Sequence, residues 1–400
     1  MSESTLLNTS TARPRQRRIA GLDAARGLAL VGMIAIHVLP AYNEEFAPTL
    51  TWRIAAGTSA ALFAFLAGVG LSISTSRGRD SGAELRAARA SLLMRGVMIA
   101  GIGLVLGQFD VPAAIILSYY GVMFALAVPL LGRGPRVLFG YALLFTTLGA
   151  FATQRFGVAV PNLGESDPSV SLLFSDPGGT LGSLFLAGSF PALAWMSYIC
   201  AGMAVGRLDL RSFDVQLRLM LAGASTALLT FVASAILLGP LGIKQVLVRT
   251  SRGWMDAEEV QDVLIWGPLD DTPLESAWWQ VNLSPYSNSS FELLNTLGVA
   301  LAVFGALLWL GSKAEWLLVP LGKVGSMTLS LYAGHLLVLA TGLGSEAPYL
   351  TFWIHCAAAL LMAVLWRNIT ALQRGPLEHL VALGADRIKE RSLARSQTHG

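Results

Sequence analysis

Two ionisable residues stand eleven positions apart in one strongly apolar segment, residues 22–39 (LDAARGLALVGMIAIHVL). Arg26 lies near its start and His37 near its end. Eleven residues of an α-helix make three turns plus roughly 20°, so both side chains share one face, about 16 Å apart along the axis. Ionisable residues inside a membrane span are costly, and they usually face a protein interior or a water-filled cavity. The pair predicts a fixed cation towards one side of a membrane and a proton-transfer group towards the other.

Each of these residues also has a purely structural interpretation. Arg26 could extend its guanidinium to the membrane surface, and His37 could be satisfied by a neighbouring carbonyl. Asp23 lies one turn before Arg26, so the two could form an ion pair. The shared face of Arg26 and His37 favours a functional role over these alternatives.

Further polar residues are predicted at the same depth as His37. His335, in SLYAGHLL, follows Tyr332 by one helical turn, so the two share a face. His355 has no polar neighbours in the sequence and is interpreted as structural. The other candidates are Gln108, Asp110, Ser118, Tyr119 and Tyr120. A His beside a Tyr or an Asp is typical of general acid–base catalysis.

The elements that must position these residues are membrane-spanning helices. The chain is 54% hydrophobic and only 13% charged, whereas soluble domains are about 25% charged. We predict an all-α, polytopic helix bundle with about ten transmembrane helices, and an eleventh is compatible with the pattern. The predicted spans are residues 20–40, 54–74, 93–109, 114–131, 136–153, 181–205, 217–239, 292–310, 319–342 and 350–366.

The distribution of Lys and Arg predicts the orientation of the bundle. With a cytoplasmic N-terminus, the inner segments hold 22 of the 28 Lys and Arg residues and the outer segments hold five. This asymmetry predicts that both termini are cytoplasmic and that the chain lies in the cell membrane. The net charge of +3 then reflects topology and contact with membrane lipids, not nucleic-acid binding.

The chain divides into three predicted regions. Residues 1–18 are a disordered cytoplasmic arm, 19–383 a transmembrane domain, and 384–400 a disordered basic tail. The domain contains a long outer loop, 240–291, in which 256–266 are typical of an amphipathic helix. The tryptophans of this loop are Trp254, Trp266, Trp278 and Trp279. They could stack on sugar rings, although an interfacial aromatic belt is the favoured interpretation.

Several kinds of site are disfavoured by the sequence. The five His residues are scattered, and Cys200 and Cys356 lie at different predicted depths, so we expect neither a metal cluster nor a disulfide. There is no Gly-rich phosphate loop, GxSxG elbow or HExxH motif. These absences argue against a P-loop ATPase, a serine hydrolase of the usual kind and a zincin. A carrier that uses the same residues as a proton relay stays open.

Several motifs resemble known transmembrane acyltransferases. RIAGLDAARGLALVGMIAIHV resembles their opening motif, an Arg, ten residues and a His, which here are Arg26 and His37. SAALFAFLAGVGLSIS and LSYYGVMFALAVPLL resemble segments of the heparan-α-glucosaminide N-acetyltransferase and YeiB families. PALAWMSYICAGMAVGRLDL, GKVGSMTLSLYAGHLL and RGPLEHLV are similar to YeiB-type proteins.

The resemblance implies that acetyl-CoA, or another acyl-CoA, binds from the cytoplasmic side. The acyl group would pass to a hydroxyl or amine of an outward-facing acceptor. His37 would be the base and His335 a second proton-handling group, while Asp23 and Arg26 would shape the CoA entrance. The residues expected to line the acceptor site are Gln108, Asp110, Ser118, Tyr119 and Tyr332. No metal is implied, a carbohydrate acceptor is compatible with the Trp-rich loop, and a homodimer is compatible with the chain.

Two departures from the family pattern leave the catalytic base open. The lysosomal branch carries its catalytic His in the loop after the first span, and residues 41–53 contain none. Some relatives have a Pro-His-Ser motif where this chain has Pro285, Tyr286 and Ser287. Two other classes therefore remain: a transporter or exporter of a small lipid or metabolite along Arg26 and His37, and a sensor or structural partner in envelope assembly. Saturable acetyl-CoA binding would separate the enzyme from the carrier.

Overall fold

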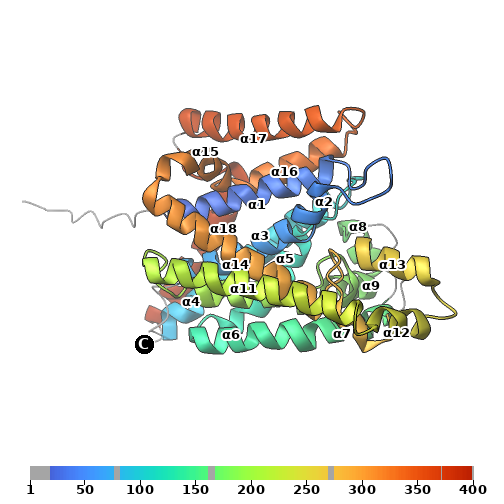
Figure 1. Ribbon diagram of the computed structural model, residues 1–400. Coiled ribbons are helices and arrows are strands. Elements are labelled where there is room, and N and C mark those ends of the chain that lie inside the picture. Colours follow the sequence, from blue (N-terminus) through green and yellow to red (C-terminus); the bar gives the residue numbers. More distant parts are fainter. Residues whose placement is uncertain (1–18, 76–81, 161–166, 269–273, 371, 399–400) are drawn as a thin grey trace, which may run out of the picture.

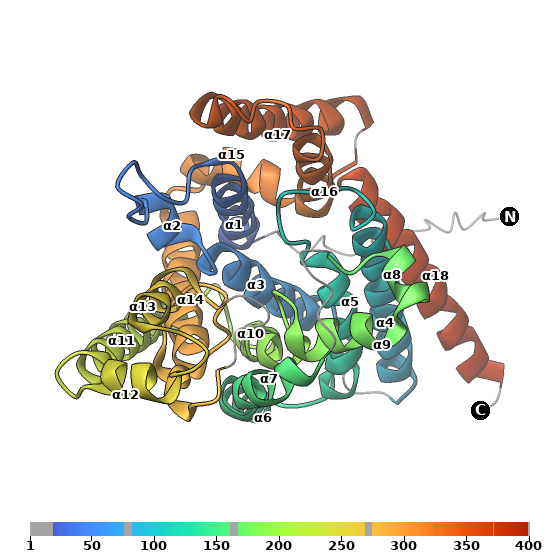
Figure 2. The ribbon, with the colours of Figure 1, turned by 90° about the vertical axis from the view of Figure 1, so that its right-hand side faces the viewer.

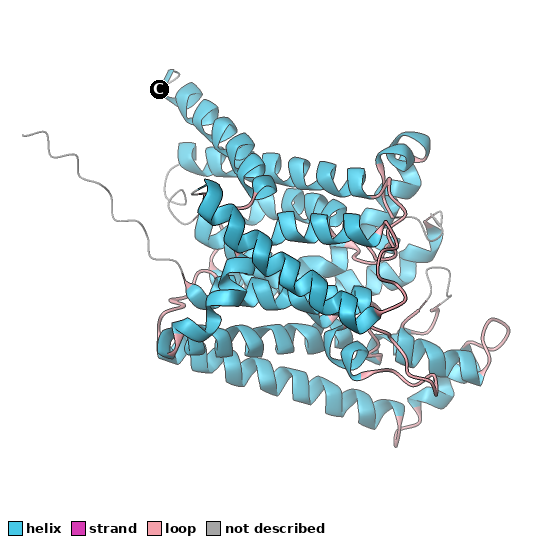
Figure 3. Cartoon of the chain, turned by 90° about the horizontal axis from the view of Figure 1, so that it is seen from above, coloured by secondary structure: helices cyan, strands magenta, loops and turns pink. Residues whose placement is uncertain are grey.

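The computed structural model describes residues 19–75, 82–160, 167–268, 274–370 and 372–398, so the predicted arm at 1–18 lies outside it. The described residues fold into helices joined by loops, with no β-strand among them (Figures 1 and 3). The all-α class predicted from the apolar periodicity is therefore confirmed.

Among the described residues, seven helical segments are long and apolar enough to cross a membrane. They are α1 (Ala20–Val38), α2 and α3 together (Leu50–Ser74), α4 (Gly82–Leu106), α6 to α7 (Pro135–Ala159), α11 (Phe213–Leu238), α14 (Ser290–Lys313) and α17 (Pro348–Thr370). An eighth would be a pair bent by 50°, Pro177–Ala187 followed by α10 (Ala192–Val205). Two further predicted spans are the shorter apolar helices Leu117–Leu130, which begins with α5 (Leu117–Ala127), and α16 (Thr328–Leu339). The total of about ten spans therefore stays a prediction.

Two segments predicted as continuous spans are broken in the structure. Between Pro177–Ala187 and α10 the chain bends at Gly188–Pro191, and Pro191 cannot donate a helical backbone hydrogen bond. The segment 319–342 divides into α15 (Glu315–Gly325) and α16. A hydropathy pattern predicts how long an apolar segment is, but it does not predict where the helix bends or breaks.

The start of α16 is capped by a side chain from another helix. The Glu378 carboxylate of α18 (Pro376–Thr398) accepts hydrogen bonds from the backbone N–H of Leu329 at 2.7 Å and of Ser330 at 3.2 Å. The Ser330 hydroxyl also donates to this carboxylate and accepts from the backbone N–H of Leu377 at 3.0 Å. Glu378 thereby satisfies N–H groups that an interrupted helix would leave open.

The two ends of the bundle are named here after the polar residues of α1, the Arg26 end and the His37 end. In Figure 1 the bundle lies on its side, with the Arg26 end on the left and the His37 end on the right. α1 begins and α18 ends on the left, while α2 (Leu50–Ala55), α8 (Val170–Ser175), α12 (Ile243–Thr250) and α13 (Ala257–Trp266) gather on the right. Which end faces the cytoplasm stays a prediction.

α3 and α10 form the centre of the bundle, seen end-on in Figure 2. Every residue of α10 except Leu193 is buried. α1 packs against both α3 and α15, and its fit against α15 depends on glycine. A Cβ at Gly27 would collide with the Leu321 carbonyl, and one at Gly325 with the Asp23 carbonyl. This close approach fixes the position of α1, and therefore of Arg26 and His37.

The predicted disorder of the tail, 384–400, is wrong over 384–398, because these residues belong to α18. Ala385 is fully buried, and Gly384 lies against Met98 of α4. The high charge of the tail favoured disorder, but its few small and apolar residues share a face that packs on α4. Residues 399–400 lie outside the described chain.

The loop predicted at 240–291 is largely structured. The helix expected at 256–266 is confirmed as α13, which begins with a capping box between Asp256 and Glu259. α12, α13 and the turn Ala277–Val281 enclose a small hydrophobic core of their own, in which Trp279 is 2% exposed. This subdomain covers the His37 end of α11 and α14.

Candidate active site

Three histidines from three distant parts of the chain meet at the His37 end. Nδ1 of His37, on α1, lies 3.2 Å from Nε2 of His335, on α16. Nδ1 of His335 lies 2.6 Å from Nδ1 of His355, on α17. The rings of His37 and His335 are stacked with centroids 5.4 Å apart, and His355 stands edge-on to His335. His335 is 6% exposed and His355 is 9% exposed, so the cluster is sheltered from solvent.

The cluster forms a continuous path for a proton. A hydrogen bond between two neutral imidazoles needs one N–H and one lone pair, and His335 uses both of its ring nitrogens. When Nδ1 of His37 is the donor, Nε2 of His37 is left as a free base. If that Nε2 accepts a proton, transfers along the two hydrogen bonds return His37 to a neutral state and leave the positive charge on His355.

His37 lines a narrow cavity at the His37 end. Its walls come from α1, from α2 and α3, from the loops before α5, α10 and α14, and from α16, which contributes Tyr332. The Tyr332 hydroxyl donates to the Ala114 carbonyl at 3.3 Å, and its ring centroid lies 6.4 Å from that of His37. Tyr332 is therefore close to His37, as the sequence predicts.

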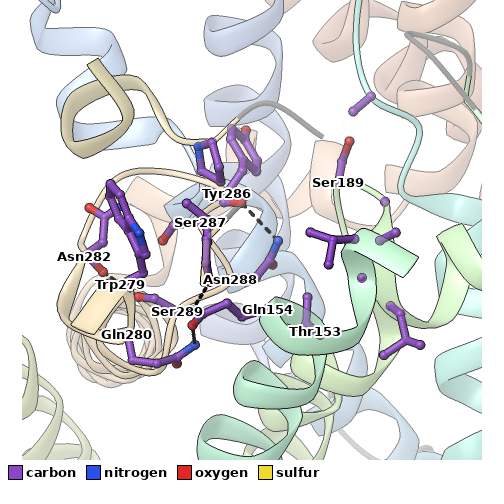
Figure 4. A pocket seen from close by; sticks show the side chains of 18 residues that line it. Thr153, Gln154, Ser189, Trp279, Gln280, Asn282, Tyr286, Ser287, Asn288 and Ser289 are labelled. Atoms are coloured by element: carbon purple, nitrogen blue, oxygen red, sulfur yellow. Dashed lines mark hydrogen bonds between the residues drawn. The ribbon is translucent and has the colours of Figure 1, made fainter. Parts of the chain in front are cut away.

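A larger cavity of about 230 Å³ adjoins the narrow one, because Ala114 and Tyr286 line both. Figure 4 shows the loop from Asn282 to Ser289 along one side of the larger cavity and Thr153 and Ser189 on the other. The two cavities are therefore neighbours, and His37 lines the narrow one.

The loop that carries Tyr286 is held in an unusual backbone conformation. Tyr286 and Asn288 have positive φ angles of 58° and 52°, which cost about 1–3 kcal/mol each where the side chain is bulky. Trp195 Nε1 donates to Asn288 Oδ1 at 2.7 Å, and Asn288 Nδ2 donates to the Tyr286 carbonyl at 3.0 Å. The Ser289 hydroxyl donates to the Asn282 carbonyl at 2.5 Å. These bonds fix the Tyr286 ring between the two cavities.

The Arg26 end of α1 carries the predicted ion pair. Arg26 Nη1 lies 3.4 Å from Asp23 Oδ1, and the side chains are 28% and 18% exposed. The Arg26 guanidinium also extends over Gly70 of α3, where a Cβ would stand 2.6 Å from Nη2. Gly70 thus leaves the space in which the guanidinium lies.

The other predicted residues are placed differently. Gln108 and Asp110 are exposed beyond the end of α4, and Gln108 bonds to Ser171 at the start of α8. Ser118 is buried with its hydroxyl 3.4 Å from the Ile115 carbonyl. None of these three lines either cavity, so the two cavities do not support their predicted place in the acceptor site, which stays a prediction. Tyr119 is buried behind Gly188, a residue of the larger cavity, with its hydroxyl against that glycine.

Three groups near the site were missed or underrated from the sequence. His355 was interpreted as structural, although its predicted depth matched that of His37 and His335. The Tyr120 hydroxyl is buried without a hydrogen-bond partner among the described residues, on the same helix turn as Tyr119. Glu292, in the first turn of α14, is 2% exposed, and its Oε2 has no hydrogen-bond partner within the described chain. Tyr120 was already a candidate from the sequence, and the depth of His355 could have been read from it, whereas no sequence signal indicated Glu292.

No group of three or more His, Cys, Asp or Glu side chains in the described ranges is arranged to hold a metal ion. The site offers three imidazoles hydrogen-bonded in series, with the Tyr332 phenol beside them, for handling protons. A buried relay ending in a cavity is typical of a site that removes a proton from a bound group.

A comparison with known protein families gives a match for this chain. Residues 18–239, more than half of the chain, match the family described as heparan-alpha-glucosaminide N-acetyltransferase, catalytic. The chain therefore belongs to this family of membrane acetyltransferases. A comparison with curated proteins finds no match. The matched region includes Asp23, Arg26 and His37, and it ends before the helices that carry His335 and His355.

Proposed function

We propose that the protein is an acyltransferase of the cytoplasmic cell membrane that uses acetyl-CoA, or another acyl-CoA, as donor. The donor enters from the Arg26 end, where Arg26 and Asp23 shape the entrance. The acceptor, a glycan or glycolipid group, enters from the His37 end through the two adjoining cavities. The observation that carries the proposal is the histidine relay ending at a cavity, in a chain of this family.

The transfer step follows from the geometry of the relay. The acceptor hydroxyl or amine gives its proton to Nε2 of His37 while its oxygen or nitrogen attacks the thioester carbonyl carbon. The new bond forms as the carbon–sulfur bond breaks, and CoA leaves as a thiolate that then takes up a proton. His335 and His355 spread the charge of the protonated relay. General-base assistance of this kind contributes about 10²–10⁴-fold to the rate.

The test is acetyl transfer from labelled acetyl-CoA by purified wild-type protein and the His37→Ala variant. His379→Ala is the matched control, because His379 lies on α18 and lines neither cavity. We expect His37→Ala to lose at least about 10²-fold in transfer and in acetyl-CoA hydrolysis while its acetyl-CoA binding is unchanged. His379→Ala should behave like wild type.

Two other results would each contradict part of the proposal. Equal transfer by wild type and His37→Ala would leave the enzyme class intact and make His335 the candidate base. Absence of acetyl-CoA binding by wild type would reject the acyltransferase. In that case a transporter, in which the same relay conducts protons, becomes the better explanation.

A further inference from the structure

We propose that the start of α3 binds the carbonyl oxygen of the donor thioester and stabilises the negative charge that develops on it during acyl transfer. The groups that do so are the backbone N–H of Ser59, the backbone N–H of Ala60 and the Ser59 hydroxyl. This inference rests on the proposed function and adds a second set of catalytic groups to His37.

The apolar segment Leu50–Ser74 is interrupted between α2 and α3 (Figure 1). α2 ends at Ala55, Ala56 is extended and 4% exposed, and Gly57 precedes α3 (Thr58–Ser74) with a φ of 68°. A break inside an apolar span opens backbone groups that lipid cannot satisfy, so such breaks are tolerated where they face protein or a cavity. The interruption therefore needs a partner for the N–H groups that it opens.

The first turn of α3 leaves two backbone N–H groups without a partner in the described chain. The helical hydrogen bonds begin with the N–H of Ala61, which donates to the Gly57 carbonyl at 2.9 Å. The N–H groups of Ser59 and Ala60 find no acceptor among the described carbonyls and side chains. Ser, Thr, Asp or Asn usually accepts from such groups at the N-cap, whereas Gly57 has no side chain with which to do so.

This helix end meets the narrow cavity. Ser59 and Ala60 both line it, together with His37. The Ser59 side chain belongs to a residue that is only 9% exposed, and its hydroxyl has no hydrogen-bond partner within the part of the chain that the structure describes. A buried polar group without a partner indicates a water or a ligand. Three hydrogen-bond donors and the base of the relay therefore face one small space.

The dimensions of this space suit a reacting carbonyl group. The narrow cavity has a volume of about 10 Å³, which is roughly the space that one water molecule or one carbonyl oxygen fills. The Ser59 hydroxyl lies against Gly32 of α1, where a Cβ would collide with it, and Gly32 precedes His37 by five residues. Five residues span about 7–8 Å along a helix. This separation leaves room for the acceptor atom beside His37 and the thioester carbonyl beside α3, with a hydrogen bond of about 3 Å at each end.

The charge on the carbonyl oxygen changes during the transfer. The oxygen or nitrogen of the acceptor forms a bond to the thioester carbon, and the electrons of the C=O π bond move onto the carbonyl oxygen. They return when the carbon–sulfur bond breaks and CoA leaves as a thiolate. N–H groups at a helix N-terminus carry a partial positive charge, so they stabilise the oxyanion between these two events.

The number of donors favours the transition state over the bound substrate. A carbonyl oxygen has two lone pairs, which the N–H groups of Ser59 and Ala60 can occupy. An oxyanion has a third, and the Ser59 hydroxyl supplies the third donor. An interaction that is made only in the transition state raises kcat without tightening substrate binding.

Glu292 offers a rival interpretation, in which its carboxylate caps the same helix end. Its Oε1 would stand 3.3 Å from a Cβ built on Gly57. However, Glu292 lines neither cavity, and no hydrogen bond joins it to the N–H of Ser59 or Ala60 in the described chain. These N–H groups therefore stay available to a ligand in the narrow cavity.

The experiment replaces single backbone N–H groups of the full-length protein with ester oxygens. Incorporation of α-hydroxyalanine at position 60 removes the Ala60 N–H and keeps the side chain. The same ester at position 61 is the matched control, because the Ala61 N–H donates within the chain and Ala61 does not line the narrow cavity. Ser59→Ala removes the hydroxyl and keeps both N–H groups. Each variant is measured by acetyl-transfer kinetics, by thermal denaturation and by the infrared carbonyl band of bound acetyl-CoA labelled with ¹³C.

We expect the ester at position 60 to lower kcat by at least about 10²-fold while the KM for acetyl-CoA stays near that of wild type. Ser59→Ala should lower kcat by at least about tenfold. The ester at position 61 should lower the denaturation temperature and keep kcat. In wild type the bound carbonyl band should lie below that of free acetyl-CoA, and only the ester at position 60 should return it towards the free value.

Equal kcat values for the two esters would overturn the inference, and so would a carbonyl band that binding leaves unchanged. If the ester at position 60 prevented folding, Ser59→Ala would decide, because a wild-type kcat in that variant would also overturn it. Failure of the proposed function would look different. A wild-type protein that neither binds nor turns over acetyl-CoA would reject the acyltransferase and the oxyanion site together, whereas acetyl transfer with equal esters would reject only the oxyanion site.

Discussion

Replacing Glu378 with Ala should displace the helix that carries His335. The Glu378 carboxylate receives two backbone N–H groups at the start of α16 and the Ser330 hydroxyl. In Glu378→Ala these groups lose their acceptor at a half-buried helix end. The first turn of α16 would then fray, and Tyr332 and His335 stand one and two turns further along.

The expected loss of stability can be worked from these contacts. Loss of a helix N-cap costs about 1 kcal/mol, in a range of about 0.5–2, and hydrogen bonds to charged groups contribute about 1.5–3 kcal/mol. Because Glu378 is partly exposed, we expect about 2 kcal/mol in total, roughly a 30-fold change in the folding equilibrium. A shift of about 1 Å at His335 can cost about 10²-fold in rate.

The assay combines thermal denaturation in detergent with acetyl-transfer kinetics. Glu378→Ala should lower both the denaturation temperature and kcat, while the KM for acetyl-CoA stays near that of wild type. Glu378→Gln keeps one carbonyl oxygen for the backbone N–H groups, so it should recover about half of the stability and most of kcat. Glu390→Gln, an exposed position on the same helix, is the control.

The reasoning would be refuted if Glu378→Ala matched Glu390→Gln in both stability and kcat. If Glu378→Ala lowered stability but the folded fraction kept the wild-type kcat, the positioning role of Glu378 would be refuted. In that case Glu378 would only anchor α18 and would not position His335.

Two further predictions concern the ends of the site. Gly70→Ala should push the Arg26 guanidinium aside and weaken acetyl-CoA binding in a thermal-shift titration, whereas Gly101→Ala, where a Cβ meets open space, should not. Asn288→Ala should leave the buried Trp195 Nε1 without a partner at a cost of about 1–3 kcal/mol, measured by thermal denaturation. Asn288→Asp keeps that acceptor, so an equal loss in both variants would contradict the role of the bond.

The apolar pattern was sufficient for the class of fold and for where its helices lie. It could not predict the bends at Gly188–Pro191 and between α15 and α16, because hydropathy sums over a window and is unaffected by a change of direction. At the end of the chain, the charge pattern predicted disorder where the structure has a helix. Residues 384–398 are highly charged, yet a few small residues around Ala385 suffice to pack α18 on α4.

The site was predictable where its residues share one helix. The spacing of Arg26 and His37 places them on one face of α1, and the Tyr332–His335 pair follows the same rule. His355 could not be assigned, because its partners lie on other helices and the meeting of α16 and α17 is a tertiary contact. Gln108 and Asp110 were chosen for depth alone, and depth does not determine which way a side chain faces.

The relay joins the first described helix to two of the last, and His335 follows His37 by 298 positions. At about 5–20 residues per second, a ribosome needs roughly 15–60 s to make that stretch. Throughout that interval the nascent chain contains His37 without the two histidines that complete the relay. The relay can therefore form only when synthesis is nearly finished. A chain that stopped after residue 239 would retain the whole family-matched region and only one of the three histidines.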